Sequence, residues 1–186
     1  MQSLCVFIRA LETPRVTRPC SGCSRLSTFV CSERFRVNAQ QKSLDVWLIY
    51  RCEECKTTWN LTVHSRVNPR QLPSEDLNAY MANNQGMAWK VAFDRVLIER
   101  AGGHINLNVP VELEKSPATG EDLLLIRSPY PVGIRLDRVL SQLLSLSRSS
   151  VQKMAKAGEF DFGKEKAKRI LRRPIHDGQT IGLILK

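Results

Sequence analysis

Two pairs of cysteines with the same internal spacing constrain the N-terminal part of this chain more than any other feature. The sequence reads "CSGC" at residues 20–23 and "CEEC" at residues 52–55, with 28 residues between the pairs. A gap of two residues lets both sulfurs of one tight turn point at the same ion, and two such turns complete a tetrahedral thiolate site. The spacing therefore predicts one metal site with four ligands, Cys20, Cys23, Cys52 and Cys55.

Zinc, iron and a redox disulfide can all use cysteines at this spacing. The long segment between the two pairs favours zinc over iron. A redox pair would need a helix start that lowers a thiol pKa, whereas both pairs here lie at the ends of strand-like segments. Cys5 and Cys31 alternate with apolar residues and are expected to be small buried side chains.

Three segments around the cysteine pairs have the alternating pattern of half-buried strands. They are rich in β-branched and aromatic residues and span residues 25–38, 44–52 and 58–67. Together with the two cysteine turns, this pattern over residues 18–67 resembles the zinc-ribbon class, which implies a three-stranded antiparallel sheet and a structural Zn²⁺. Many ribbons have glycine directly after the second cysteine of the first turn, whereas this chain has Ser24 there and Gly22 inside the pair.

The middle of the chain predicts two helices followed by two strands. Helices are expected over residues 72–84 and 86–103, and strands over residues 105–115 and 122–128. No residue pattern in this segment indicates a chemistry of its own. It is therefore interpreted as a helical and mixed connector.

Positive charge is concentrated at the two ends of the sequence. Residues 1–72 carry 11 basic and 5 acidic side chains, residues 73–134 carry 5 and 8, and residues 135–186 carry 12 and 5. The overall net charge is +10. Clustered positive charge favours polyanions such as nucleic acid, although many basic surfaces are only solvated.

The C-terminal segment predicts two short amphipathic helices and a small β structure. Helices are expected over residues 134–147 and 146–160, followed by a short strand, a basic turn and a final strand. The ordered motifs "RLDRVL", "SRSSVQKMAKAGEF" and "DGQTIGLIL" resemble the small RNA-binding domain of ribosomal small-subunit protein four, the alpha-L motif. The resemblance covers residues 134–186 and implies binding of structured RNA such as rRNA or tRNA, with the ribosome as a further candidate partner.

The basic side chains of this segment fall largely outside the predicted apolar stripes. We expect them to form a surface that contacts RNA mainly through phosphates and shape. The candidate residues are Arg135, Arg138, Arg148, Lys153, Lys156, Lys164, Lys166, Lys168, Arg169, Arg172 and Arg173.

The sequence as a whole predicts an α+β chain in three parts. They are a zinc-ribbon domain over residues 1–72, a connector over 73–130 and an alpha-L type RNA-binding domain over 131–186. The stretch "FRVNAQQKSLDVWLIYRCEECKTTWNLTVHSRVNP" also resembles a small bacterial family of uncharacterised proteins.

The predicted function is that of a non-catalytic, zinc-containing RNA-binding protein. The three histidines lie outside metal-ligand and triad spacings, and no glycine-rich phosphate loop occurs. The alternatives are a DNA-binding or transcription-associated zinc protein and a zinc-linked thiol redox sensor. Six cysteines, the absence of a leader sequence and the absence of a run of roughly 20 apolar residues favour a cytoplasmic location without a membrane partner.

Overall fold

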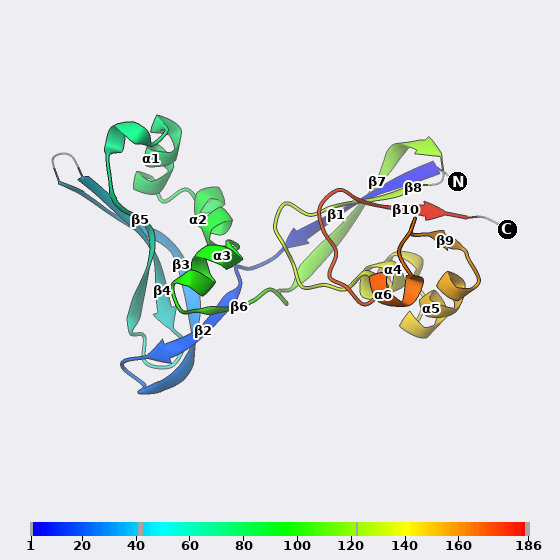
Figure 1. Cartoon of the computed structure of the whole chain (residues 1–186), viewed down its shortest axis with the longest axis horizontal. Helices are drawn as coiled ribbons and strands as arrows, with labels where there is room; N and C mark the ends of the chain where they lie inside the picture. Colours follow the sequence, from blue (N-terminus) through cyan, green and yellow to red (C-terminus); the bar gives the residue numbers. More distant parts are fainter. Residues whose placement is uncertain (1, 41–42, 122, 185–186) are drawn as a thin grey trace. The chain divides into compact units, whose positions relative to one another are not determined.

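The computed structural model describes the chain in three stretches, residues 2–40, 43–121 and 123–184. The chain forms two compact units, one of residues 13–106 and the other of residues 1–12 together with residues 107–186 (Figure 1). Within the described residues, each unit contains one five-stranded sheet, and the chain has six α-helices in all. The predicted α+β class is confirmed.

The unit of residues 13–106 is built on an antiparallel sheet that extends the predicted ribbon. Its strands in spatial order are β5 (Thr58–Val67), β4 (Ser43–Cys52), β3 (Arg25–Gln40), β2 (Arg15–Cys20) and β6 (His104–Asn106). The three predicted strands correspond to β3, β4 and β5. The expectation of a three-stranded sheet is wrong, because β2 pairs with β3 and β6 pairs with β2. Arg18 and Pro19 interrupt the apolar alternation that would otherwise mark β2 as a strand.

Three helices follow this sheet in sequence, α1 (Ser74–Met81), α2 (Gln85–Ala92) and α3 (Arg95–Arg100). The single helix predicted over residues 86–103 is wrong, since it is divided between α2 and α3. The Asp94 side chain accepts a hydrogen bond from the Leu97 N–H at 2.9 Å and begins a new helix. An N-cap bond of this kind replaces a missing intrahelical bond, and it stabilises the break at this position.

A β-bulge in β3 connects the sheet to the helices. The pairing register of β3 with β4 shifts between Cys31 and Phe35, and Glu33 has a positive φ of 56°. The Glu33 carboxylate accepts a hydrogen bond from Trp89 Nε1 at 2.7 Å, and Asn83 Oδ1 accepts one from the Phe35 N–H at 2.6 Å. The bulge thus turns polar groups of the strand towards α2 and the residues before it.

The core of this unit lies between the sheet and its helices. Val46, Leu48 and Tyr50 alternate along β4 and are fully buried. Ala88 and Ile98 of the helices belong to the same buried cluster. The cysteine turns follow strands of this sheet, and the helices therefore cover the apolar face of the same sheet.

The second unit contains a mixed sheet. Its strands in spatial order are β7 (Val111–Glu121), β1 (Gln2–Ala10), β8 (Leu123–Arg127), β10 (Gln179–Leu183) and β9 (Phe160–Asp161). β1 runs antiparallel to β7 and parallel to β8, and the remaining neighbours are antiparallel. The first strand of the chain therefore pairs with strands that follow it by more than a hundred residues.

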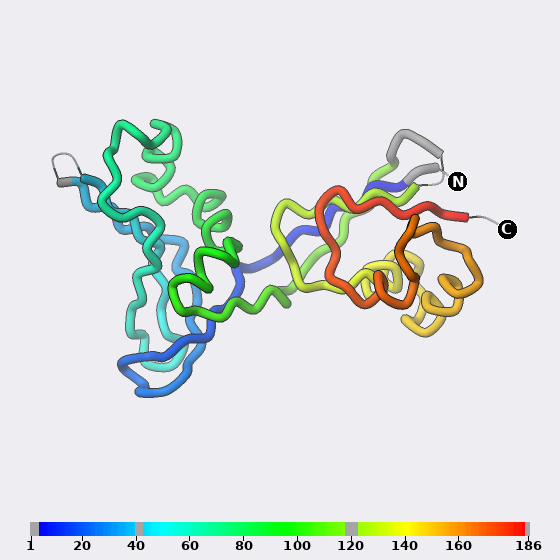
Figure 2. Tube along the Cα trace, in the orientation of Figure 1, coloured from blue at the N-terminus to red at the C-terminus, as the bar shows by residue number. Residues whose placement is uncertain are grey.

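This pairing gives domain boundaries that differ from the three predicted parts. Figure 2 shows the first strand, in blue, beside the green and yellow-green segments of the later sequence with which it pairs. The predicted connector over residues 73–130 is shared between the units, because its helices pack on the first sheet while β7 and β8 belong to the second. Val6 and Ile8 of β1 are buried, which explains why the first strand is held in the second unit.

Three helices complete the second unit, α4 (Leu136–Leu144), α5 (Arg148–Lys156) and α6 (Ala167–Ile170). α4 and α5 lie within the two predicted helices, while α6 occupies part of the predicted basic turn. Ser147 Oγ accepts a hydrogen bond from the Ser150 N–H at 3.1 Å and begins α5. In the described part of the chain, no helix is long and apolar enough to span a bilayer.

Candidate metal centre and candidate nucleic-acid interface

The four paired cysteines form one cluster in the unit of residues 13–106. Cys20 ends β2 and Cys52 ends β4, while Cys23 and Cys55 lie in the tight turns that follow. All four sulfur atoms lie within 4.8 Å of one another. The sulfurs of Cys20 and Cys55 are 3.5 Å apart, and those of Cys23 and Cys52 are 3.8 Å apart. Each of these contacts joins one turn to the other, as the sequence spacing predicts for a single site.

The separation of the sulfurs suits a tetrahedral metal ion. Zinc binds thiolate at about 2.3 Å, which places the corners of the sulfur tetrahedron about 3.8 Å apart. The two sulfur–sulfur distances across the cluster agree with this value. The four cysteines can therefore hold a metal ion without rearrangement of the backbone.

The two cysteine turns each contain a left-handed residue at the same place. Ser24 has a φ of 53° and Lys56 a φ of 64°, and each directly follows the second cysteine of its pair. Both residues are in the left-handed region, where glycine is usual but polar residues also occur. The absence of glycine after Cys23 therefore does not prevent the turn from forming.

Gly22 allows the two turns to approach each other closely. A Cβ atom at this position would lie 2.3 Å from Thr57 Oγ1 and 2.8 Å from Cys55 Sγ. Such distances are shorter than any ordinary contact, so a side chain here would force the turns apart. The glycine inside the first pair is thus explained by the packing of one turn against the other.

Hydrogen bonds favour the charged form of one of the ligands. Cys55 Sγ is hydrogen-bonded to Thr57 Oγ1 at 3.1 Å, and this bond helps to lower the pKa of the Cys55 thiol to about 6. The pKa of the Cys23 thiol is raised to about 12, chiefly by its hydrogen bond with the Cys55 side chain. Metal binding requires thiolates, so a bound cation would displace the proton that the cluster retains.

A cation–π contact lies beside the cluster. The Arg18 guanidinium carbon is 4.2 Å from the centre of the Trp59 ring, and the charge of Arg18 interacts with Cys20. The Arg18 guanidinium is partly removed from water, and this burial lowers its pKa. This positive group offsets part of the negative charge that four thiolates would introduce.

The two remaining cysteines and His64 have structural roles. Cys5, in the other unit, and Cys31 are each 8% exposed, and their prediction as small buried side chains is confirmed. His64 lies in β5 and contacts a helix residue. Its ring is half-buried, and Nε2 lies 3.2 Å from the Tyr80 hydroxyl.

The predicted RNA-binding residues belong to the second unit, where two of them bind a buried carboxylate. Asp137 in α4 is fully buried, and its Oδ2 accepts hydrogen bonds from Arg135 Nη2 at 2.7 Å and from Arg148 Nη2 at 2.8 Å. Arg148 was expected on the free basic face of its helix. The structure instead places it in an ion pair that links α5 to α4.

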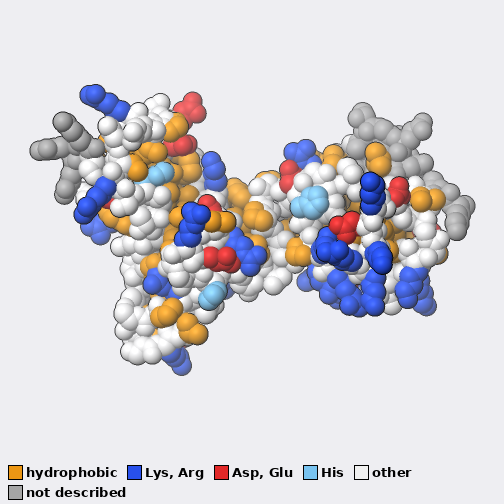
Figure 3. All heavy atoms as spheres, viewed as in Figure 1, with side chains coloured by type: hydrophobic (Ala, Val, Ile, Leu, Met, Phe, Trp, Pro, Cys, Tyr) orange, Lys and Arg blue, Asp and Glu red, His pale blue; other side chains and the backbone are white. Residues whose placement is uncertain are grey.

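A third candidate, Arg173, forms an ion pair with Glu165 at 2.7 Å. The other candidates carry no ion pair in the part of the chain that the structure describes. They are Arg138, Lys153, Lys156, Lys164, Lys166, Lys168, Arg169 and Arg172. Figure 3 shows Lys and Arg side chains gathered over the helices of this unit. The unit therefore presents an uncompensated basic surface.

Sequence reasoning missed the residues that support both sites. Asp137 interrupts the apolar residues of its helix, and a carboxylate in an otherwise buried stripe is a signal for a paired cation. Thr57 follows Cys55 at a spacing that suits a hydrogen bond to a turn sulfur, but many sequences share that pattern.

Comparison with known proteins places the chain in a family. Residues 37–166 match the family described as "Protein of unknown function (DUF1062)", which is more than half of the sequence. The chain belongs to this family. The expected likeness to a family without an assigned function is thereby confirmed. No curated protein and no solved structure matches the chain. The DUF1062 match includes Cys52 and Cys55, and it begins after Cys20 and Cys23.

Substitution of Gly22 tests the close approach of the two turns. We expect Gly22→Ala to weaken metal binding by about tenfold or more, as is typical of residues that position ligands. Competition of the protein with a chelator of known affinity measures this change. Gly86→Ala is the control, because among the described residues its added Cβ would meet only Asn84 Oδ1, at 3.3 Å. Equal metal affinity in both variants would contradict the packing argument.

Removal of both arginines from Asp137 tests the buried ion pair. The variant with Arg135→Ala and Arg148→Ala leaves a buried carboxylate without a cation, and we expect the free energy of unfolding to fall by about 3 kcal/mol. Each single variant keeps one pair and should lose less. Urea unfolding measures the change. Arg173→Ala is the control and should cost about 1 kcal/mol or less, since both side chains of the Arg173–Glu165 pair are exposed. A double variant as stable as this control would show that the pair contributes little.

Proposed function

We propose that this protein is a non-catalytic RNA-binding protein that carries a structural zinc ion and acts on rRNA, tRNA or the ribosome. The observation that carries the proposal is the basic surface formed by the eight candidate residues without ion pairs. A side chain without an acidic partner keeps its charge available for a phosphate, and several such side chains on one surface attract a polyanion.

The arrangement of this surface favours structured RNA. Lys153 and Lys156 are exposed on α5, while Lys168 and Arg169 lie on the neighbouring α6. Proteins recognise folded RNA largely by shape and phosphate position, which suits cations fixed on rigid helices. The resemblance of the motifs in this segment to the alpha-L motif supports the same function.

The metal centre has a structural role in this proposal. The four thiolates would fill the coordination sphere of a tetrahedral Zn²⁺ and leave no position for water or substrate. Zinc at this site would join the ends of β2 and β4 and so stabilise the sheet of its unit.

Zinc analysis of the purified full-length chain tests the metal assignment. We expect one zinc per chain, and we expect the variant with Cys52→Ser and Cys55→Ser to lose it and to unfold the unit of residues 13–106. The control is Cys31→Ala, which removes a buried thiol outside the cluster and should retain zinc. Undiminished zinc in the double variant would overturn the assignment.

The salt dependence of RNA binding tests the basic surface. Each phosphate contact contributes about 0.7 to 0.9 to the slope of log affinity against log salt. We expect Lys153→Ala with Lys156→Ala to weaken binding of structured RNA and to flatten the slope by roughly 1 to 2 units. The helix should persist, because alanine is the better helix former and neither lysine is paired. Arg148 is left unchanged because it holds Asp137.

A variant of the other unit provides the matched control. Arg70→Ala with Arg100→Ala removes the same net charge from exposed positions of residues 13–106 and should leave the slope unchanged. Competition between structured RNA and duplex DNA at one fixed salt concentration separates RNA binding from DNA binding. The proposal fails if the lysine variant binds RNA with unchanged affinity and slope, or if DNA competes as well as RNA.

A further inference from the structure

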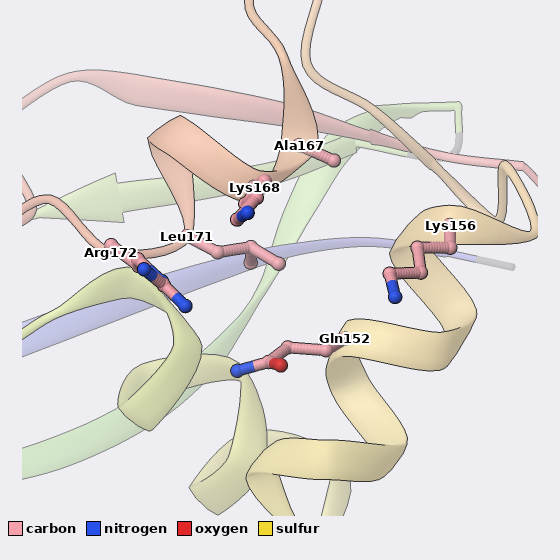
Figure 4. Close-up of a pocket in the computed structure, with 6 residues that line it drawn as sticks. All are labelled: Gln152, Lys156, Ala167, Lys168, Leu171 and Arg172. Atoms are coloured by element: carbon pink, nitrogen blue, oxygen red, sulfur yellow. The ribbon is translucent and has the colours of Figure 1, made fainter.

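The basic surface of the second unit is hollowed between α5 and α6. The hollow has a volume of about 190 Å³, and Figure 4 shows the six residues that line it. They come from both helices and from the residues that directly follow α6. The lining residues are Gln152, Lys156, Ala167, Lys168, Leu171 and Arg172.

The floor and the rim of this hollow differ in chemistry. Leu171 is only 2% exposed and points from the end of α6 towards α5, so it provides an apolar floor together with Ala167. Lys156, Lys168 and Arg172 are exposed around it, and no acidic residue is among those that line the hollow. A ligand that fits here presents an apolar surface to the floor and negative charge to the rim.

The side chain of Gln152 adds an amide, which can both donate and accept hydrogen bonds. It points from α5 into the hollow, opposite Leu171 (Figure 4). Within the described part of the chain, no residue forms a hydrogen bond with its amide. A glutamine amide offers an acceptor and two donor hydrogens, which match the mixed donors and acceptors on the edge of a nucleobase.

We propose that this hollow binds a single unpaired nucleotide of an RNA strand. The base lies on Leu171 with its edge at Gln152, and the flanking phosphates contact Lys156, Lys168 and Arg172. The inference rests on the proposed RNA binding of the same surface and specifies which RNA feature that surface recognises.

The dimensions and chemistry of the hollow favour a base over other occupants. Pockets for drug-sized ligands have roughly 300–1,000 Å³, so this hollow accommodates about one flat ring system. A bare phosphate would be bound through converging N–H groups and would gain nothing from an apolar floor. The bases of a paired helix are stacked and cannot enter it, whereas unpaired bases in loops and bulges can be splayed out into protein pockets.

Three RNA probes isolate the contribution of the base. The first is a fully paired duplex, the second is the same duplex with one unpaired nucleotide, and the third has an abasic nucleotide at that position. Loss of the stacking contact between one base and an aromatic side chain lowers affinity by roughly five- to hundredfold. Because the hollow contains no aromatic ring, we expect the full-length protein to bind the bulged RNA about fivefold more tightly than the paired and abasic RNAs.

Two variants and a matched control test the position of the base. Ala167→Leu fills the hollow without a change of charge, and Gln152→Ala removes the amide while favouring the helix. Both should bind the paired duplex as the unchanged protein does and should lose the preference for the bulge. Ala157→Leu adds the same atoms at an exposed position beyond the hollow and should keep the preference.

The results distinguish this inference from the proposed function. Salt-dependent binding with equal affinity for all three RNAs would overturn the nucleotide site and leave the basic surface as the RNA-binding element. A bulge preference that persists in both Ala167→Leu and Gln152→Ala would also overturn it. No binding of any of the RNAs would overturn the proposed function and the nucleotide site together.

Discussion

Asp137 joins the three helices on which the proposed function depends, through its buried carboxylate and its backbone N–H. Its side chain binds Arg148 at the start of α5 and Arg135 just before α4. Its backbone N–H donates to the Leu171 carbonyl oxygen at 3.0 Å, directly after α6. One residue of α4 therefore contacts both of its neighbours. A fully buried charge is tolerated only when it is paired. Moving either arginine away would leave the carboxylate less well compensated, so both arginines are held in place.

This interaction divides the basic side chains of the second unit into two groups with different roles. Arg135 and Arg148 neutralise an internal charge, and their loss would be felt as lost stability. The lysines further along α5 and the two basic residues of α6, Lys168 and Arg169, form no such pair in the described structure, and they are exposed to solvent. Because the hollow lies between α5 and α6, Asp137 also positions its two walls relative to each other. The geometry of the proposed RNA site thus depends on Asp137, a buried residue that does not itself contact RNA.

Local patterns in the sequence predicted much of this structure. The cysteine spacing identified the four residues that cluster, because the geometry of a two-residue gap is the same in any strand-end turn. The amphipathic pattern over residues 146–160 predicted a helix that the structure contains as α5. These features depend on residues within a few positions of one another, and such short-range effects can be read from the order of the residues.

The features that were missed depend on distant residues. The pairing of β1 with β8 brings Val6 beside Ile126, and no local pattern reveals which strands will meet. Arg148 has the spacing of an exposed helix residue, and only the fold shows that a carboxylate eleven positions earlier is buried next to it. The break before α3 was overlooked because the apolar spacing continues through Asp94, although that residue is a common N-cap.

The most direct test of the account is to locate the RNA on the full-length protein. Photo-crosslinking to structured RNA, followed by mass spectrometry of the crosslinked peptides, identifies the residues in contact. The account predicts crosslinks within α5 and α6, centred on the residues that line the hollow between them. Crosslinks confined to residues 13–106 would contradict it, because RNA would then be bound by the unit that carries the cysteines.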